Sequence, residues 1–122
     1  MFALLINLGI IIVALLHIWF AILEMFLWQK PLGLKTFKLE SEFAKRSAAL
    51  AANQGLYNLF LSAGLIWSLF SSDPFQAFNL KIFFLSCVLI AGIYGGITVS
   101  KRIFYVQGLP AAIILLLILF TN

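Results

Sequence analysis

Four long runs almost without charge constrain this chain more than any other feature of it. They cover residues 2–28, 47–70, 75–100 and 103–121. Within them, only Glu24 and Lys81 carry a charged side chain. A helix that crosses a membrane needs about 20 apolar residues, and in lipid a helix satisfies its own backbone polar groups. The runs therefore predict an all-α fold, an integral membrane antiparallel four-helix bundle that forms a single transmembrane domain over residues 1–122.

The composition excludes several other classes of protein. Of the 122 residues, 64% are hydrophobic and 10% are charged, whereas soluble domains carry about 25% charged residues. A soluble domain this small has too much surface to hide so many apolar side chains. A soluble enzyme, a nucleic-acid binder and a disordered regulator are therefore excluded. The net charge of +4 is interpreted as a result of membrane topology and not as a nucleic-acid footprint.

The positions of the Lys and Arg side chains predict the orientation of the chain in the membrane. The loop between the first two runs carries Lys30, Lys35, Lys38, Lys45 and Arg46, and the loop before the last run carries Lys101 and Arg102. Short loops rich in Lys and Arg stay in the cytoplasm. We therefore expect a multi-pass protein of the plasma or inner membrane with both termini outside the cytoplasm. This asymmetry disfavours antiparallel dimers and leaves a parallel homo-oligomer open.

Turn-forming residues set the expected ends of the helices. Pro31 and Gly33 act as breakers in the first loop. Ser41, followed by Glu42, is typical of the start of the second helix, because a hydroxyl caps the first turn and an acid suits its positive end. The second helix is therefore expected to start in water and then to enter the bilayer.

The start of the fourth helix has two interpretations. In the first, the helix begins near Ile103 and is kinked at Pro110. In the second, the third helix ends around Tyr105 with Gly108 as its cap, and the fourth begins at Pro110. The second leaves about 12 residues, roughly 18 Å of helix, against a hydrocarbon core of about 30 Å. We therefore favour the first.

Polar side chains inside the runs agree in depth. Those within eleven residues of the cytoplasmic end of their run include His17, Glu24, Asn53, Gln54, Tyr57, Asn58, Tyr94 and Gln107. An ionisable group inside a span is costly and indicates a function. We predict a polar pocket in the cytoplasmic half of the bundle, with His17 and Asn58 at its floor and with Glu24, Gln54 and Gln107 at its rim.

Within this pocket, His17 and Glu24 are the candidate catalytic residues. They lie seven residues apart, so they share one helical face. The amides and the tyrosines of the set are the candidate ligand-binding residues. Each has a structural interpretation too: Glu24 could pair with Lys30 or Arg102, and His17 could be a buried group satisfied by Asn58. The other amides could be hydrogen-bonding links between helices.

Other kinds of site lack the residues they need. One His and one Cys cannot supply the three or four ligands of a zinc site, and a Ser-His-Asp triad is excluded because Asp73 lies in the outer loop. Gly92, Gly95 and Gly96 lie inside a span, where small residues are typical of close helix packing. We therefore expect no metal and no cofactor.

Four segments of the chain resemble a known family. They are His-Ile-Trp-Phe-Ala-Ile-Leu-Glu-Met-Phe-Leu-Trp at 17–28, Asn-Gln-Gly-Leu-Tyr-Asn at 53–58, Gly-Leu-Ile-Trp at 64–67 and Gln-Gly-Leu-Pro-Ala at 107–111. These segments are similar to the small membrane family catalogued as domain of unknown function 1304, and the segment at 53–58 is the most specific. The resemblance covers nearly the whole chain and implies a four-helix integral membrane protein of bacterial type. It implies no reaction.

Three functional hypotheses are consistent with these patterns. In the first, the pocket binds a small apolar or amphipathic molecule from the cytoplasmic leaflet, and His17 with Glu24 supplies protons or hydrogen bonds to it. In the second, the chain is a proton-coupled small-molecule transporter that acts as an oligomer. In the third, it is an accessory subunit of a membrane complex. Membrane lipids are expected partners in all three, and nucleic acid in none.

Overall fold

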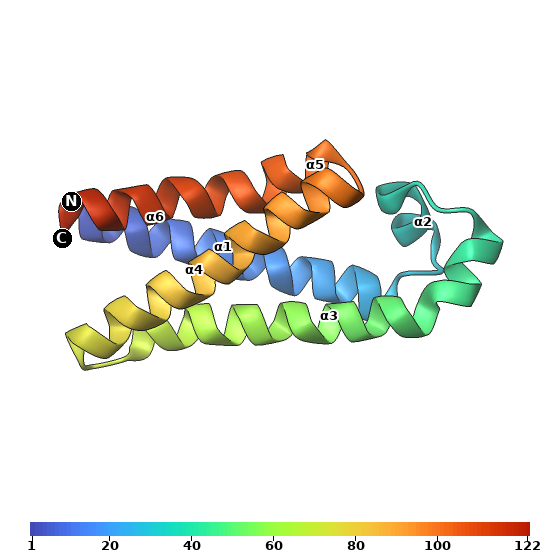
Figure 1. Cartoon of the computed structure of the whole chain (residues 1–122). Coiled ribbons are helices and arrows are strands. Elements are labelled where there is room, and N and C mark those ends of the chain that lie inside the picture. Colours follow the sequence, from blue (N-terminus) through green and yellow to red (C-terminus); the bar gives the residue numbers. More distant parts are fainter. The chain divides into compact units, whose positions relative to one another are not determined.

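The structure, a computed structural model, describes all 122 residues and is built from helices (Figure 1). In chain order the elements are α1 (Phe2–Phe26), α2 (Pro31–Phe37), α3 (Ser41–Phe70), α4 (Pro74–Thr98), α5 (Lys101–Ile103), the π-helix η1 (Phe104–Gly108) and α6 (Leu109–Thr121). The chain contains no strand. The predicted all-α class is thus confirmed.

Three helices are long and apolar enough to cross a membrane. They are Phe2–Phe26, Pro74–Thr98 and Lys101–Thr121, with mean hydropathies of 2.5, 2.0 and 2.4. The third of these is the continuous run of α5, η1 and α6. The 30 residues of α3 are long enough to cross, but Asn53, Gln54 and Asn58 lower its hydropathy, because amides are poorly soluble in hydrocarbon. A membrane crossing by α3 stays a prediction.

The chain divides into two compact units. The terminal unit consists of residues 1–14 and 63–122, and the central unit consists of residues 15–62. Both divisions fall inside a helix, the first in α1 and the second in α3. The predicted arrangement as one four-helix bundle stays a prediction.

In the terminal unit, α4 turns back through α5 and η1 into α6 (Figure 1). Glycines bring the two arms of this hairpin together. A Cβ atom added to Gly92 would meet the backbone of Gly108, and one added to Gly96 would lie 2.8 Å from the Cβ atom of Phe104. Helix backbones approach this closely in lipid only where side chains are absent. The G-x-x-x-G pair therefore serves packing.

The chain is helical from Lys101 to Thr121, so Pro110 lies inside a helix and does not begin one. Proline has no N–H to donate and its ring crowds the preceding turn. The turn before it is a π-helix, in which the Leu109 N–H donates to the Phe104 carbonyl, five residues back. A π-turn is one way to fit an extra residue into a helix, and here it accommodates the proline.

The first loop of the central unit contains a short helix where the sequence suggests only breakers. Pro31 begins α2, because its missing N–H would have no partner in the first turn anyway. Gly33 is buried, and a Cβ atom there would meet the Leu27 carbonyl oxygen. The helix ends at Lys38, which adopts the left-handed conformation (φ 53°, ψ 51°). Pro31 and Gly33 thus shape a helix and do not prevent one.

An indole ring of the central unit links α2 to α3. The Trp28 Nε1 donates to the Ser47 Oγ at 3.0 Å, and the Trp28 ring lies 5.0 Å from the Phe37 ring, centroid to centroid. Both contacts lie just outside the apolar part of α1, where indoles commonly sit at a membrane boundary. Trp28 therefore holds the chain just after α1 against both α2 and α3, close to the polar groups of α1 and α3.

Candidate functional site

The central unit holds a buried carboxylate. Glu24, in the last turns of α1, is only 2% exposed, and its Oε1 accepts a hydrogen bond of 2.6 Å from the Asn58 Nδ2 of α3. Gln54, one turn before Asn58, is a further hydrogen-bond partner of the same carboxylate. The structure thus brings three of the predicted site residues together.

Gly55 allows the short Asn58 side chain to reach α1. A Cβ atom on Gly55 would lie 3.1 Å from the Ala21 carbonyl oxygen, 3.2 Å from the Glu24 Cβ and 2.6 Å from the Met25 Cγ. The two helices therefore touch through the backbone at this level. Sequence reasoning missed Gly55, although its place within the amide segment Asn-Gln-Gly-Leu-Tyr-Asn was a usable signal.

His17 lies on the same face of α1 as Glu24 and is fully buried. Its ring makes an edge-to-face contact with Phe20, at 5.8 Å between centroids and 71° between planes. Seven residues of helix separate the Cα atoms of His17 and Glu24 by about 10 Å. The buried face therefore carries its two ionisable groups at different depths, as the spacing predicts.

The depth count placed Asn58 level with His17, and the structure pairs Asn58 with Glu24 instead. The difference has a simple cause. Side chains on a helix lean toward its N-terminus, so the carboxylate of Glu24 lies deeper in α1 than the position of its Cα suggests. The second helix itself begins at Ser41, where the sequence predicts its start.

Two further predicted site residues of the central unit lie on its surface. Asn53 is exposed and Tyr57 is 62% exposed, with a ring contact to Phe60. Tyr94 of α4 is 70% exposed, and Gln107 of η1 is half-buried; both belong to the terminal unit. Their part in a site stays a prediction.

The terminal unit contains a second polar pair, which the sequence reasoning missed. The Lys81 Nζ of α4 donates to the Asn7 Oδ1 of α1 at 3.0 Å. A side-chain amide of α1 thus satisfies one of the donors of the Lys81 ammonium group. The two residues lie at matching depths from the other ends of their runs, so the test applied to the cytoplasmic half would have found them.

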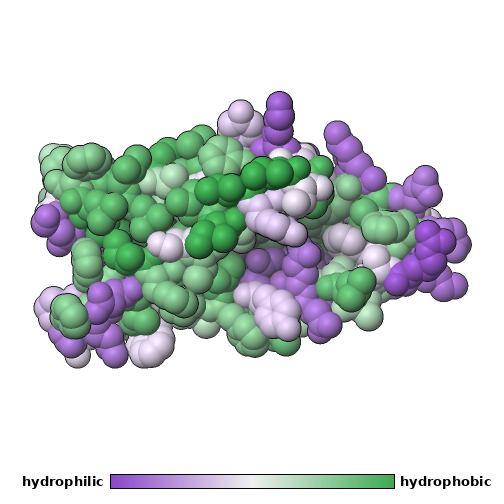
Figure 2. All heavy atoms as spheres, viewed as in Figure 1, coloured by the Kyte–Doolittle hydropathy of each residue, from purple (hydrophilic) through white to green (hydrophobic).

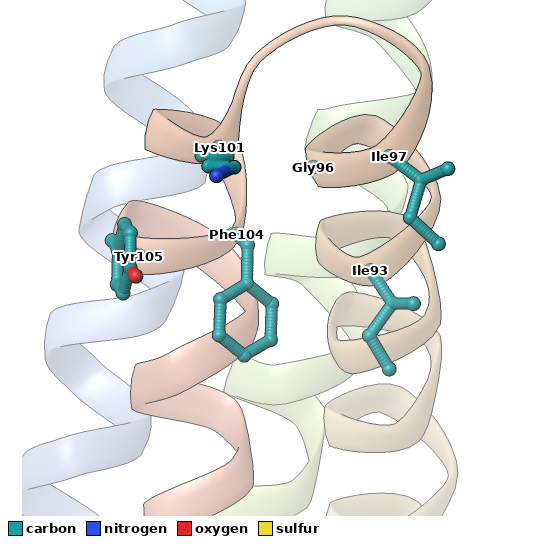
Figure 3. A pocket seen from close by; sticks show the side chains of 6 residues that line it. All are labelled: Ile93, Gly96, Ile97, Lys101, Phe104 and Tyr105. Carbon is teal, nitrogen blue, oxygen red and sulfur yellow. The ribbon is translucent and has the colours of Figure 1, made fainter.

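A pocket of about 280 Å³ also lies in the terminal unit (Figure 3). It is lined by Ile93, Gly96 and Ile97 of α4 and by Lys101, Phe104 and Tyr105 of the returning helix. None of these belongs to the predicted site. The chain has no group of three or more His, Cys, Asp or Glu that could hold a metal ion.

Comparisons with known proteins agree with the resemblance. Residues 11–119 match the family described as "Protein of unknown function (DUF1304)". The chain is 31% identical over 100 residues to the uncharacterized protein YpaA of Lactococcus lactis subsp. lactis (strain IL1403), covering 80% of this chain and 82% of the relative. No solved structure matches the chain.

Proposed function

Because this chain belongs to the DUF1304 family, whose description states no function, we propose a function from its own residues. We propose that it is an integral protein of the plasma or inner membrane. In this proposal, it binds a small lipid-like molecule from the cytoplasmic leaflet through the carboxyl group of Glu24.

The placement in a membrane is supported by the apolar side chains that face outward. Along α1 and α6 these include Leu4, Leu8, Ile12, Leu15, Ile113, Leu116, Leu119 and Phe120. Hydrophobic side chains also cover α6 and the N-terminal part of α1 on the face shown in Figure 2, whereas hydrophilic ones gather around α2. Each such apolar side chain left in water forfeits about 1.5–3 kcal/mol of burial free energy, so lipid is the favourable surrounding.

The binding role is supported above all by the buried hydrogen bond between Glu24 and Asn58. An acid in a membrane span is expensive, faces the protein interior and marks a site. A carboxyl group offers about four acceptor positions on its two oxygens, and Asn58 and Gln54 occupy two of them. The remaining positions, with the amides of Asn58 and Gln54, suit a ligand that carries a hydroxyl or amine group on an apolar body.

His17 extends this polar face deeper into the membrane. Since about 10 Å of helix rise separates it from Glu24, proton transfer between the two requires a group placed between them. A bound molecule with its own hydroxyl would be such a group. In this proposal Glu24 exchanges a proton with the polar head of the ligand, and His17 orients the part that reaches further in.

The proposal is tested by the molecules that copurify with the protein. Wild-type protein, Glu24→Gln and the control Glu42→Gln, which changes an exposed acid of α3, are extracted in a mild detergent and their small molecules are analysed by mass spectrometry. We expect a compound bound in near-stoichiometric amount to the wild type and to the control, and lost from Glu24→Gln. Equal retention by all three proteins, or no enriched compound in any, would reject the site.

A further inference from the structure

We propose that the pocket between α4 and the Lys101–Tyr105 segment binds the head group and one acyl chain of an anionic phospholipid. The pocket combines one cation and one phenol with an apolar wall, and its lining contains no acid. This inference rests on the membrane placement proposed above, and it concerns a different site from that of Glu24.

The arrangement of the lining suits an amphipathic molecule. Lys101 lies next to the turn of the hairpin, whereas Phe104 lies further from it, between the two helices, and Ile93 lies on α4 at a similar level (Figure 3). The pocket opens outward, since Ile97 on its wall is 80% exposed. A molecule with a charged end beside the turn and an apolar end along the helices therefore matches both parts of the pocket.

The charge of the terminal unit favours an anionic partner. Lys101 and Arg102 lie side by side in sequence, and the only acidic side chain of the unit is Asp73. Asp73 precedes α4, whose 25 residues span about 37 Å, so its carboxylate cannot neutralise the two cations. Basic pockets between helices on the cytoplasmic side of a membrane bind phosphate head groups for this reason.

The expected position of this pocket at the membrane surface favours a lipid over a soluble anion as its ligand. The loop with Lys101 and Arg102 is the one that the positive-inside rule places at the cytoplasmic face. There the cation meets the anionic head groups of that leaflet while Ile93, Ile97 and Phe104 meet acyl chains. A free phosphate would use only the cation and leave the apolar wall unoccupied.

Gly96 helps to keep this space open. A Cβ atom at Gly96 would come within 2.8 Å of the Phe104 Cβ, so the hairpin arms meet there without a side chain from α4. The apolar groove beside Gly96 is therefore a product of the same close approach that packs α4 against η1.

Native mass spectrometry of the full chain in a non-ionic detergent tests the proposal. Dioleoylphosphatidylglycerol and dioleoylphosphatidylcholine, which share acyl chains and differ in charge, are added separately. We expect preferential binding of the phosphatidylglycerol, and an affinity about five-fold lower for Lys101→Gln, the change that one Lys near an anionic surface makes. The matched control Lys35→Gln removes the same charge from α2 and should bind like the wild type.

Three results would overturn the proposal: equal binding of the two lipids by the wild type, an equal loss in Lys35→Gln, or complete competition by excess inorganic phosphate. The comparison of the two lipids with the wild-type protein tests the proposal even if Lys101→Gln does not fold. The other proposals fail separately. Recovery of the chain in the soluble fraction would contradict the membrane placement. The Glu24 site is tested by its own copurification experiment, and Glu24→Gln should still prefer phosphatidylglycerol to phosphatidylcholine.

Discussion

At the scale of single residues, the central unit depends on one carboxylate and the amide that donates to it. Asn58 is half-buried and its Nδ2 points at the Glu24 Oε1. Two substitutions of Glu24 separate its acidity from its role as an acceptor. Glutamine keeps a carbonyl oxygen in the same place, whereas alanine leaves the Asn58 donor without a partner.

We therefore expect Glu24→Ala to lower the free energy of unfolding by about 1–3 kcal/mol, the usual penalty for an unpaired buried donor. Glu24→Gln should change it by less than about 1 kcal/mol. Unfolding of the purified protein in mixed micelles, followed by circular dichroism, measures both. The exposed Glu42→Ala should be nearly neutral, and an equal loss in Glu24→Ala and Glu42→Ala would contradict a structural role for the hydrogen bond.

A second residue-scale prediction concerns Lys38, the only non-glycine residue with a positive φ. A side chain in the left-handed conformation costs about 1–2 kcal/mol, and glycine removes that cost while adding entropy to the unfolded chain. We expect Lys38→Gly to raise the free energy of unfolding by about 0.5–1 kcal/mol. The control Lys35→Gly lies within α2, where glycine lowers stability by up to about 1 kcal/mol. A gain in both, or a loss in Lys38→Gly, would contradict the assigned cap.

At the scale of elements, the hairpin of α4 and η1 depends on a backbone contact. A methyl group on Gly92 would meet the backbone of Gly108, which cannot rotate away. One on Gly9 would meet only the end of the Ile114 side chain, at 2.9 Å, and a side chain can move. The two glycines therefore offer a matched comparison.

Gly92→Ala should destabilise the protein. Overpacking costs about 1–3 kcal/mol, and the higher helix propensity of alanine returns at most about 1 kcal/mol. Gly9→Ala should be neutral or slightly stabilising for the same propensity reason. The thermal unfolding midpoints of the two variants in one detergent give the comparison. A lower midpoint for Gly9→Ala than for Gly92→Ala would show that the hairpin contact is not formed.

At the scale of the whole molecule, the membrane orientation is open to direct measurement. Cys87 is replaced by Ser, and single cysteines are introduced as Lys35→Cys in the first loop and Ser72→Cys in the second. On intact cells, a membrane-impermeant maleimide should label Ser72→Cys at once and Lys35→Cys only after permeabilisation. The reverse pattern would invert the orientation, and labelling of both on intact cells would contradict the crossing of α3.

Much of the helical layout was predictable from hydropathy, because charge-free runs end where polar residues begin. The helices Phe2–Phe26 and Pro74–Thr98 match the first and third runs closely. The short helix α2 was missed, since Pro31 disfavours a helix interior but suits a first position. The favoured single helix through Pro110 matches the structure, whereas its π-turn left no pattern in the sequence.

The residues of the candidate site were easier to predict from the sequence than the contacts between them. Glu24, Gln54 and Asn58 were identified because polar groups in a span are rare. Their pairing depends on how far each side chain leans along its helix and on the missing side chain of Gly55, neither of which a count of depth includes. The pocket at Lys101 could not be predicted for a related reason. Its lining residues come together because the chain turns back after α4, and they form no motif in the sequence.

The π-turn of η1 has a further consequence for the surface that α6 presents. An α-helix turns by about 100° per residue, so the one additional residue of the π-turn sets the azimuth of every side chain after it. Ile114 and Ile118 are buried and Leu116 is exposed in this phase. A relative one residue shorter between 104 and 108 would rotate α6 by roughly that angle and turn part of its protein-facing side outward. The packing of α6 thus depends on the length of this segment as well as on its glycine at position 108.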